Sequence, residues 1–281
     1  MKRLSRIAIA LVALAAAGSA GAADLSAKKA PVYKAPPVVP VYNWSGFYVG
    51  VNAGGAWGRS NADTSTVFSP TGYFAASSVP AIAATGAQSI RSSGFTGGAQ
   101  AGYNWQTGPA VFGVEVDFNY LGLKGSTQGS ALYPCCAPTG FTINSSISPG
   151  WLFTARPRLG YAADNWLVYV TGGLAVARIK GDFTFTDTFA TALETASIST
   201  TKTGWTVGAG AEVGLQGPWS LKLEYLHVNL GSVSTTSTNL TAFTPPIAFP
   251  TNVFTHSLDL KANIVRVGLN YRFGAPVVAG Y

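Results

Sequence analysis

Residues 111–121, VFGVEVDFNYL, decide the fold class. From Phe112 to Tyr120 every second residue is apolar, and the residues between them include Glu115, Asp117 and Asn119. Alternation over this length predicts a β-strand with one apolar face and one polar face. Because the polar face carries two acids, the two faces of this strand must meet very different surroundings.

The same alternation recurs in seven other segments. Each is long enough for the roughly 9–11 residues of a tilted strand that crosses a membrane. The fifth segment is more apolar throughout, so its phase is not fixed by the pattern. The eight predicted strands are 44–57, 93–106, 109–121, 150–162, 165–179, 202–216, 219–230 and 259–273.

The connections between these strands alternate strictly in length. Three are tight and have turn residues: Thr107-Gly108, Asp164-Asn165 and Gly217-Pro218. The other four, 58–92, 122–149, 180–201 and 231–258, are long and rich in Ser, Thr, Gly and Pro. A transmembrane barrel has short periplasmic turns and longer outer loops, and eight strands need four loops and three turns.

We therefore predict an all-β chain: an eight-stranded antiparallel transmembrane up-and-down β-barrel with four long outer loops. Several aromatic residues fall near strand ends, where a barrel carries girdles at the headgroup level. They are Tyr103, Trp105, Trp151, Tyr161, Trp166, Trp219 and Phe273. A soluble β-sandwich is the alternative fold.

The two ends of the chain have a different character. Residues 1–22 combine Lys2, Arg3 and Arg6 with an apolar run and a small-residue site at Ala22, which predicts a signal peptide. Residues 23–43 are rich in Pro and predict a periplasmic linker. The barrel is expected over 44–273, and 274–281 form a C-terminal extension.

The composition agrees with a barrel embedded in lipid. Only 10% of residues are charged and 47% are hydrophobic, whereas ordinary soluble domains carry about 25% charged residues. The signal peptide holds three of the 18 basic residues, which leaves 15 bases against 11 acids, or +4, for the rest. No basic run with interleaved aromatics is present, so we expect no nucleic-acid partner.

The polar face of the strands predicts a charged barrel interior. Four acids and five bases share it: Glu115, Asp117, Arg156, Arg158, Glu212, Lys222, Glu224, Arg266 and Arg272. An eight-stranded barrel is only wide enough for side chains to fill, so these charges must pair. A salt-bridged plug of the lumen is the favoured interpretation, and a charge-lined pore is the alternative.

Catalytic, metal and cofactor sites find little support. Neither His227 nor His256 can be grouped with a nucleophile and an orienting acid, so we expect no enzyme activity and no cofactor. Cys135 and Cys136 are adjacent and lack the spacing of a metal site. They fit a passive loop pair, with a redox switch or an external crosslink as alternatives.

The chain resembles the alphaproteobacterial outer-membrane immunogenic proteins, small opacity-type eight-stranded porin-like barrels. The segment 42–55, YNWSGFYVGVNAGG, is similar to their first strand. Further similar motifs are GYNWQ at 102–106, FGVE at 112–115 and the closing VGLNYRF at 267–273. In one departure, eight residues follow Phe273, whereas such barrels tend to end at the terminal aromatic.

The resemblance implies an exported surface antigen of the Gram-negative outer membrane that supports envelope integrity. Its partners would be outer-membrane lipid and lipopolysaccharide, with periplasmic chaperones and the barrel-insertion machinery during assembly. Two alternatives remain: loop-mediated binding of haem or a host surface, and a narrow porin-like channel.

Overall fold

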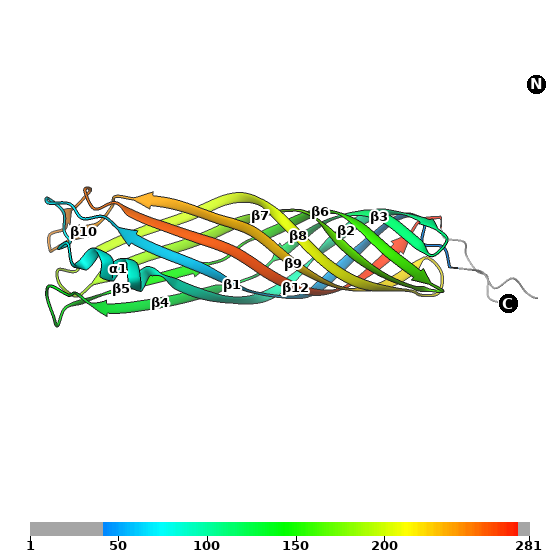
Figure 1. The fold of residues 1–281 in the computed structure, drawn as a ribbon, viewed down its shortest axis with the longest axis horizontal. Coiled ribbons are helices and arrows are strands. Elements are labelled where there is room, and N and C mark those ends of the chain that lie inside the picture. Colours follow the sequence, from blue (N-terminus) through cyan, green and yellow to red (C-terminus); the bar gives the residue numbers. More distant parts are fainter. Residues whose placement is uncertain (1–41, 275–281) are drawn as a thin grey trace, which may run out of the picture. The chain divides into compact units, whose positions relative to one another are not determined.

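The computed structural model describes residues 42–274 and contains twelve strands and one helix (Figure 1). The predicted signal peptide, all but the last two residues of the predicted linker and all but the first residue of the predicted C-terminal extension lie outside the described residues. The elements are β1 (Gly46–Thr66), α1 (Ser78–Gly86), β2 (Gln88–Thr107), β3 (Ala110–Leu121), β4 (Gly125–Leu132), β5 (Gly140–Ile147), β6 (Trp151–Ala163), β7 (Trp166–Asp187), β8 (Leu193–Gly214), β9 (Trp219–Ser237), β10 (Thr241–Ala242), β11 (Ile247–Ala248) and β12 (Phe254–Arg272).

Eight of the twelve strands form a closed ring. Antiparallel ladders join β1 to β2, β2 to β3, β3 to β6, β6 to β7, β7 to β8, β8 to β9 and β9 to β12. A long ladder from Tyr48↔Arg272 to Thr66↔Phe254 then returns β12 to β1. The predicted barrel class is confirmed, and the additional strands β4, β5, β10 and β11 belong to two of the long connections.

All three predicted tight turns are present at one end of the ring, which we call the turn end. Gly108, Asp164 and Gly217 adopt the left-handed backbone region there, with φ of 57°, 51° and 73°. Asp is one of the few residues with a side chain that tolerates this region, and Gly does so freely. Both ends of the described chain also lie here, since Phe273 N–H donates to Phe47 O.

The long connections were predicted too long. β1 continues to Thr66 and β2 already begins at Gln88, so much of 58–92 is strand. The predicted loop 180–201 is nearly all strand, with only 188–192 between β7 and β8. The reason is that alternation persists in these segments, but Ser, Thr and charged residues replace the apolar side chains on the outward face.

The outward face changes from apolar to polar along the barrel. Near the turn end, apolar side chains form a band that two aromatic girdles limit. The turn-end girdle consists of Phe47, Tyr103, Trp105, Phe112, Tyr161, Trp166, Trp219, Tyr271 and Phe273. The loop-end girdle consists of Trp57, Phe95, Tyr120, Trp151, Trp205 and Tyr225. This pattern matches the hydrocarbon band and interfacial aromatics of a membrane barrel.

Beyond the loop-end girdle the ring opens into two sheets, which we call the loop-end sandwich. The β8–β9 ladder ends at Trp205↔Asn229. Within the described residues, β2 and the segment that leads into β4 are joined by the isolated bridge Ser93↔Lys124 and not by a ladder. One sheet is therefore β4-β5-β7-β8, and the other is β9-β12-β1-β2.

The two sheets of the loop-end sandwich pack directly on each other through an apolar core. Side chains that close this core include Ile179 and Phe183 from the first sheet and Leu230, Leu258 and Leu260 from the second. The core fills the space above the charged part of the barrel. Helix α1 packs against β1 and β4, next to the gap beside β2.

Candidate functional site

The predicted charged residues all lie inside the ring. Each occupies an inward position of its strand, and all nine are buried, with exposed fractions of 5% or less. β3 supplies Glu115 and Asp117, β6 supplies Arg156 and Arg158, and β12 supplies Arg266 and Arg272. β8 and β9 supply the other three, Glu212, Lys222 and Glu224. Five strands of the ring thus contribute to one cluster.

The centre of the cluster is a network of short ion pairs. Arg156 Nη2 lies 2.7 Å from Glu115 Oε1 and 2.8 Å from Asp117 Oδ2. Arg266 Nη2 lies 2.9 Å from the same Asp117 oxygen and 2.6 Å from Glu224 Oε2. Lys222 Nζ donates to both Glu115 oxygens at 2.9 Å. Each acid in this group contacts at least two bases, which is what offsets the cost of removing such charges from water.

Arg158 and Glu212 form the part of the cluster nearer the turn end. Arg158 Nη1 lies 3.3 Å from Glu212 Oε2, and Arg158 Nε donates to Asn104 Oδ1 at 2.8 Å. Ser220 and Asn270 donate to the other oxygen of Glu212. When Arg158 and Glu212 are included, the connected network holds four acids and four bases, so it is electrically neutral.

Arg272 stands apart from that network. Its guanidinium carbon lies 4.1 Å from the centre of the Tyr42 ring and 5.3 Å from the Trp44 ring, and Nη1 donates to Asn43 O. Trp44 is fully buried. The residues just before β1 therefore cover the turn end of the lumen with aromatic rings, held by cation–π contacts to Arg272.

Two tyrosines that the charge pattern does not predict also belong to the cluster. Tyr48 donates to Glu115 Oε2 at 2.7 Å, and Tyr169 donates to Glu224 Oε1 at 2.8 Å. Tyr48 sits over Gly102, where an added Cβ would lie 2.3 Å from its hydroxyl oxygen. The inward phase of Tyr48 and the glycine opposite were the available signals.

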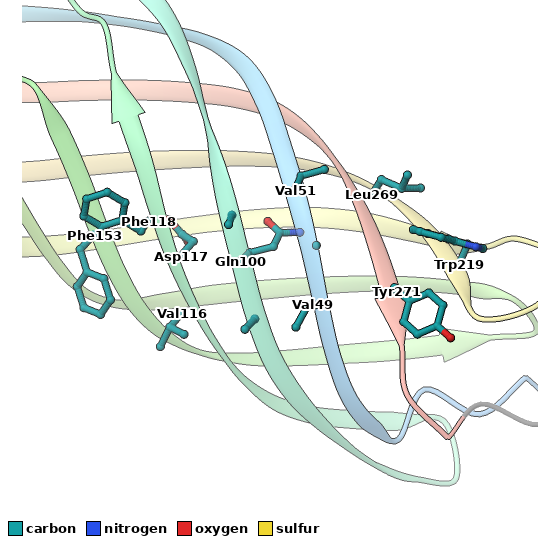
Figure 2. Close-up of a pocket in the computed structure, with 13 residues that line it drawn as sticks. Val49, Val51, Gln100, Val116, Asp117, Phe118, Phe153, Trp219, Leu269 and Tyr271 are labelled. Atoms are coloured by element: carbon teal, nitrogen blue, oxygen red, sulfur yellow. The ribbon is translucent and has the colours of Figure 1, made fainter.

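Side chains occupy the lumen at three levels along the barrel. Tyr42 and Trp44 cover the turn end, the ion-pair network fills the middle, and the apolar core of the loop-end sandwich lies above it. A hollow along these strands lies outside the ring. It is a depression of about 610 Å³ on the apolar outer face, lined by Val49, Val51, Val116 and Phe118 among others (Figure 2).

A second polar group lies inside the loop-end sandwich. Thr64 Oγ1 and His256 Nδ1 are 2.9 Å apart, and His256 Nε2 is 3.1 Å from Glu194 Oε1, which also accepts from Ser237. The imidazole stacks on Phe183 with ring centres 4.7 Å apart. This order of hydroxyl, imidazole and carboxylate has the form of a hydrolytic triad, but His256 is 0% exposed, so no substrate reaches it.

The same polar group ties strands together. Glu194 lies on β8, Ser237 on β9 and His256 on β12, so their contacts bridge β8 and β9 where the ladder between them has ended. His227, the other histidine, lies on the outer surface beside Asn263 at 3.0 Å. The two histidines are therefore not brought together.

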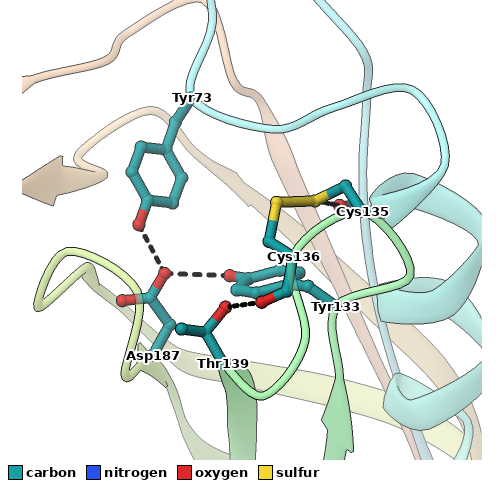
Figure 3. Close-up of a disulfide and its surroundings, with 7 residues drawn as sticks. Tyr73, Tyr133, Cys135, Cys136, Thr139 and Asp187 are labelled. Carbon is teal, nitrogen blue, oxygen red and sulfur yellow. Dashed lines mark hydrogen bonds between the residues drawn. A yellow bond between two sulfur atoms is a disulfide. The ribbon is translucent and has the colours of Figure 1, made fainter.

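The long connections meet above the sandwich around Asp187 (Figure 3). Its Oδ2 accepts from Tyr73 at 2.5 Å and from Tyr133 at 3.0 Å. Burial of the Tyr73 phenol and its hydrogen bond to Asp187 raise the pKa of Tyr73 well above its ordinary value. Burial of the Tyr133 phenol and the charge of Asp187 raise the pKa of Tyr133 in the same way. These contacts join the first, second and third connections.

Cys135 and Cys136 form a disulfide beside this group. The sequence predicts a passive loop pair without specifying its redox state, and the two sulfurs are bonded to each other. The disulfide borders a crevice of about 120 Å³, which Tyr73, Phe74, Tyr133 and Phe189 also line. The crevice is mostly apolar, and three connections contribute to it.

Comparison with known proteins identifies the family. Residues 9–273 match the model of the outer membrane protein beta-barrel domain. The 31 kDa outer-membrane immunogenic protein of Brucella melitensis is 36% identical over 256 residues, which cover 90% of this chain and 92% of that protein. The 22 kDa outer membrane protein of Rhizobium leguminosarum bv. viciae is 30% identical and covers 70% of this chain and 69% of its own length.

The chain is also similar to solved structures, one of which is that of an outer-membrane protein. The outer membrane protein OprG from Pseudomonas aeruginosa covers 82% of this chain and 97% of its own, at 10% identity and a TM-score of 0.45. The resemblance to alphaproteobacterial outer-membrane immunogenic proteins is confirmed by the relatives in Brucella and Rhizobium. The chain is an outer-membrane surface protein and belongs to the outer membrane protein β-barrel family.

Proposed function

We propose that the protein is a sealed structural barrel, which stabilises the envelope and carries the loop-end sandwich outside the cell as a surface antigen. The observation that supports this proposal is that side chains occupy the lumen at three levels. A neutral network of four acids and four bases leaves no net charge to attract ions, and the apolar core above it excludes water.

Conductance measurements test the sealed lumen. Refolded protein in planar bilayers at high salt is expected to show no discrete conductance steps. The control is a variant in which Arg156 and Glu115 are both replaced by Ala, which removes side-chain volume from the network without changing its net charge. Steps in the unchanged protein would instead support the narrow porin-like channel.

The role in envelope stability has its own test. A strain without the protein is expected to be more sensitive to detergents, and a copy restored in trans should reverse the effect. The proposal also includes delivery of the exported chain by periplasmic chaperones to the barrel-insertion machinery. Unchanged sensitivity in the deleted strain would contradict an envelope role.

A second candidate is binding through the long connections. It is favoured by the exposed aromatics Phe189 and Phe243 on adjacent connections, where Phe243 N–H donates to Ala190 O, and by the crevice at the disulfide. Between 67 and 87, and between 238 and 253, there is no charged residue. An exposed apolar surface without charge fits an uncharged partner on a host surface.

Haem does not fit these connections. Among residues 42–274, the histidine nearest to them, His256, is buried in the loop-end sandwich, and both cysteines are in the disulfide. No exposed base lies in the two charge-free connections to pair with the haem carboxylates. We therefore propose no haem site.

Host binding is tested by exchange of the connections. Replacement of 67–87 or 238–253 by short Gly/Ser turns should abolish saturable binding to host cells, while heat-modifiable migration on gels shows that the barrel still folds. The matched control replaces Asp164 and Asn165, in a tight turn at the opposite end of the barrel, by Gly and Ser. Binding that survives both exchanges would exclude this function.

A further inference from the structure

The exposed bases of the barrel gather at one level. Residues 42–274 contain twelve Lys and Arg residues, and five of them are in the lumen. The other seven all lie just beyond the loop-end girdle, six of them exposed and Lys202 half-buried: Arg59, Arg91, Lys124, Arg178, Lys180, Lys202 and Lys261. Arg59 follows Trp57 by two residues, and Lys124 follows Tyr120 by four. Within the described residues, the turn-end rim carries no exposed base.

Two of these bases face each other directly. Arg59 on β1 is paired with Arg91 on β2 in the ladder, and both side chains are exposed on the outward face. Side chains at such positions have Cβ atoms about 4.5–5.5 Å apart, and like charges placed there destabilise the sheet. The repulsion is removed when an anion lies between the two guanidinium groups.

Neighbouring strands extend this pair into a row. Lys124 follows β3 and its backbone bonds to Ser93 on β2, two residues from Arg91. On the other side, Lys261 lies on β12, next to Ala262, the partner of Gly58 in the ladder. The order across the sheet is therefore Lys261, Arg59, Arg91 and Lys124, which we call the basic row.

The basic row is short of internal counter-charge. Lys261 Nζ lies 3.5 Å from Asp259 Oδ2. In the part of the chain that the structure describes, no carboxylate lies within 4.0 Å of the charged atoms of Arg59, Arg91 or Lys124. Asp259 is itself engaged by the backbone and side chain of Asn61. The charged groups of Arg59, Arg91 and Lys124 are therefore available to bind an external anion.

We propose that the basic row binds the phosphate groups of a phosphorylated glycolipid in the outer leaflet of the membrane. The row lies immediately outside the aromatic girdle, which is the depth of lipid headgroups. Two guanidinium groups side by side present parallel N–H pairs to phosphate oxygens, and the lysines on either side add point charges. The acyl chains of the same lipid would contact the apolar band below.

Lipid binding measured on intact barrels tests the proposal. The refolded protein in detergent micelles is titrated with bisphosphorylated lipid A, and bound lipid is counted by native mass spectrometry. For Arg59→Ser/Arg91→Ser we expect an apparent affinity lower by about tenfold or more, the loss of at least one charge-assisted contact. Heat-modifiable migration must match that of the unchanged protein.

The control removes the same charge at the same level. In Arg178→Ser/Lys180→Ser two exposed bases of β7 are lost, and Arg178 already donates to Ser199. This variant should keep its affinity within about twofold. Equal losses in both double variants would show a general basic surface and overturn the basic row as a site.

Two further measurements identify the chemistry. Lipid A without phosphates should bind no better to the unchanged protein than to Arg59→Ser/Arg91→Ser, and Arg59→Lys/Arg91→Lys should retain part of the affinity. Inorganic phosphate in excess should not displace the lipid. Equal binding of the dephosphorylated lipid, or full displacement by free phosphate, would contradict the proposal.

Discussion

Leu258 on β12 packs across the loop-end sandwich onto Gly181 on β7. A Cβ added at Gly181 would lie 2.9 Å from Leu258 Cδ2. The two strands are not neighbours in the ring, so this contact shows how closely the two sheets approach each other beyond the girdle.

The Gly181–Leu258 contact predicts an intolerant position. Gly181→Val should destabilise the loop-end sandwich by about 1–3 kcal/mol, because extra methyl groups in a filled core force the sheets apart. Gly172→Ala is the control, since a Cβ there would meet no atom closer than 3.4 Å. Urea unfolding in micelles measures both, and equal stability of the two variants would mean that the sheets can separate without cost.

Removal of one acid from the lumen network predicts a large loss of stability. Glu115→Gln keeps the shape but leaves Lys222 and Arg156 without their shared carboxylate, which should cost roughly 3–5 kcal/mol. The exposed turn residue Asp164 provides the control, and Asp164→Asn should stay within about 0.5 kcal/mol. Resistance to unfolding by heat in detergent is the measurement. A Glu115→Gln/Lys222→Met variant should recover part of the loss.

The Glu194 contacts predict a local effect. Glu194→Ala removes the carboxylate that contacts Ser237 and His256. These two contacts join β8 to β9 and to β12 beyond the end of the β8–β9 ladder. We expect faster amide hydrogen exchange in 196–203 and 230–236, and no change in the strands between the girdles. Thr195→Ala, on the outward face of the same strand, should leave exchange unchanged. A uniform increase over the whole barrel would contradict a local role.

The phenols of Tyr73 and Tyr133 predict a dependence on alkaline pH. Their pKa values are raised in the folded protein, so the folded state holds these protons more tightly than the unfolded state. Their contribution to stability is complete below the ordinary tyrosine pKa of about 10 and is lost as the pH rises through the folded values.

Phenolate absorbance during an alkaline titration measures this effect. Tyr73 and Tyr133 should ionise later than the exposed tyrosines, and Tyr133→Phe should remove one of the late transitions. Tyr161→Phe, at an exposed position on the outer face, should remove none of them. Simultaneous ionisation of all tyrosines would show that Asp187 does not hold the two phenols in solution.

The membrane-embedded half of the fold could be predicted because lipid enforces a strict contrast. Between the girdles an outward residue must be apolar, so Val114 and Val116 alternate visibly with Glu115 and Asp117. The same phase located the lumen charges. The alternation does not distinguish Arg272 from the residues of the ion-pair network, because its partners Tyr42 and Trp44 precede the first strand.

The loop-end sandwich was harder to predict because water tolerates many side chains. Ser197, Ser199 and Thr201 on β8 face solvent, so the strand loses the apolar half of its pattern and resembles a loop. The inward residues Ile179, Phe183 and Ile198 still alternate, and they were the remaining signal. Contacts such as Asp187 with Tyr73 and Tyr133 join distant connections, and no local pattern encodes them.

The ion-pair network also has a consequence for the way the chain enters the membrane. Its acids and bases come from β3, β6, β8, β9 and β12, and Arg266 is supplied by the last strand. Before β12 closes the ring, the partly inserted sheet carries an excess negative charge that faces an unfilled interior. Entry into lipid and closure of the ring must therefore be nearly simultaneous, and truncation before Phe254 should leave the chain in the periplasm, as fractionation would reveal.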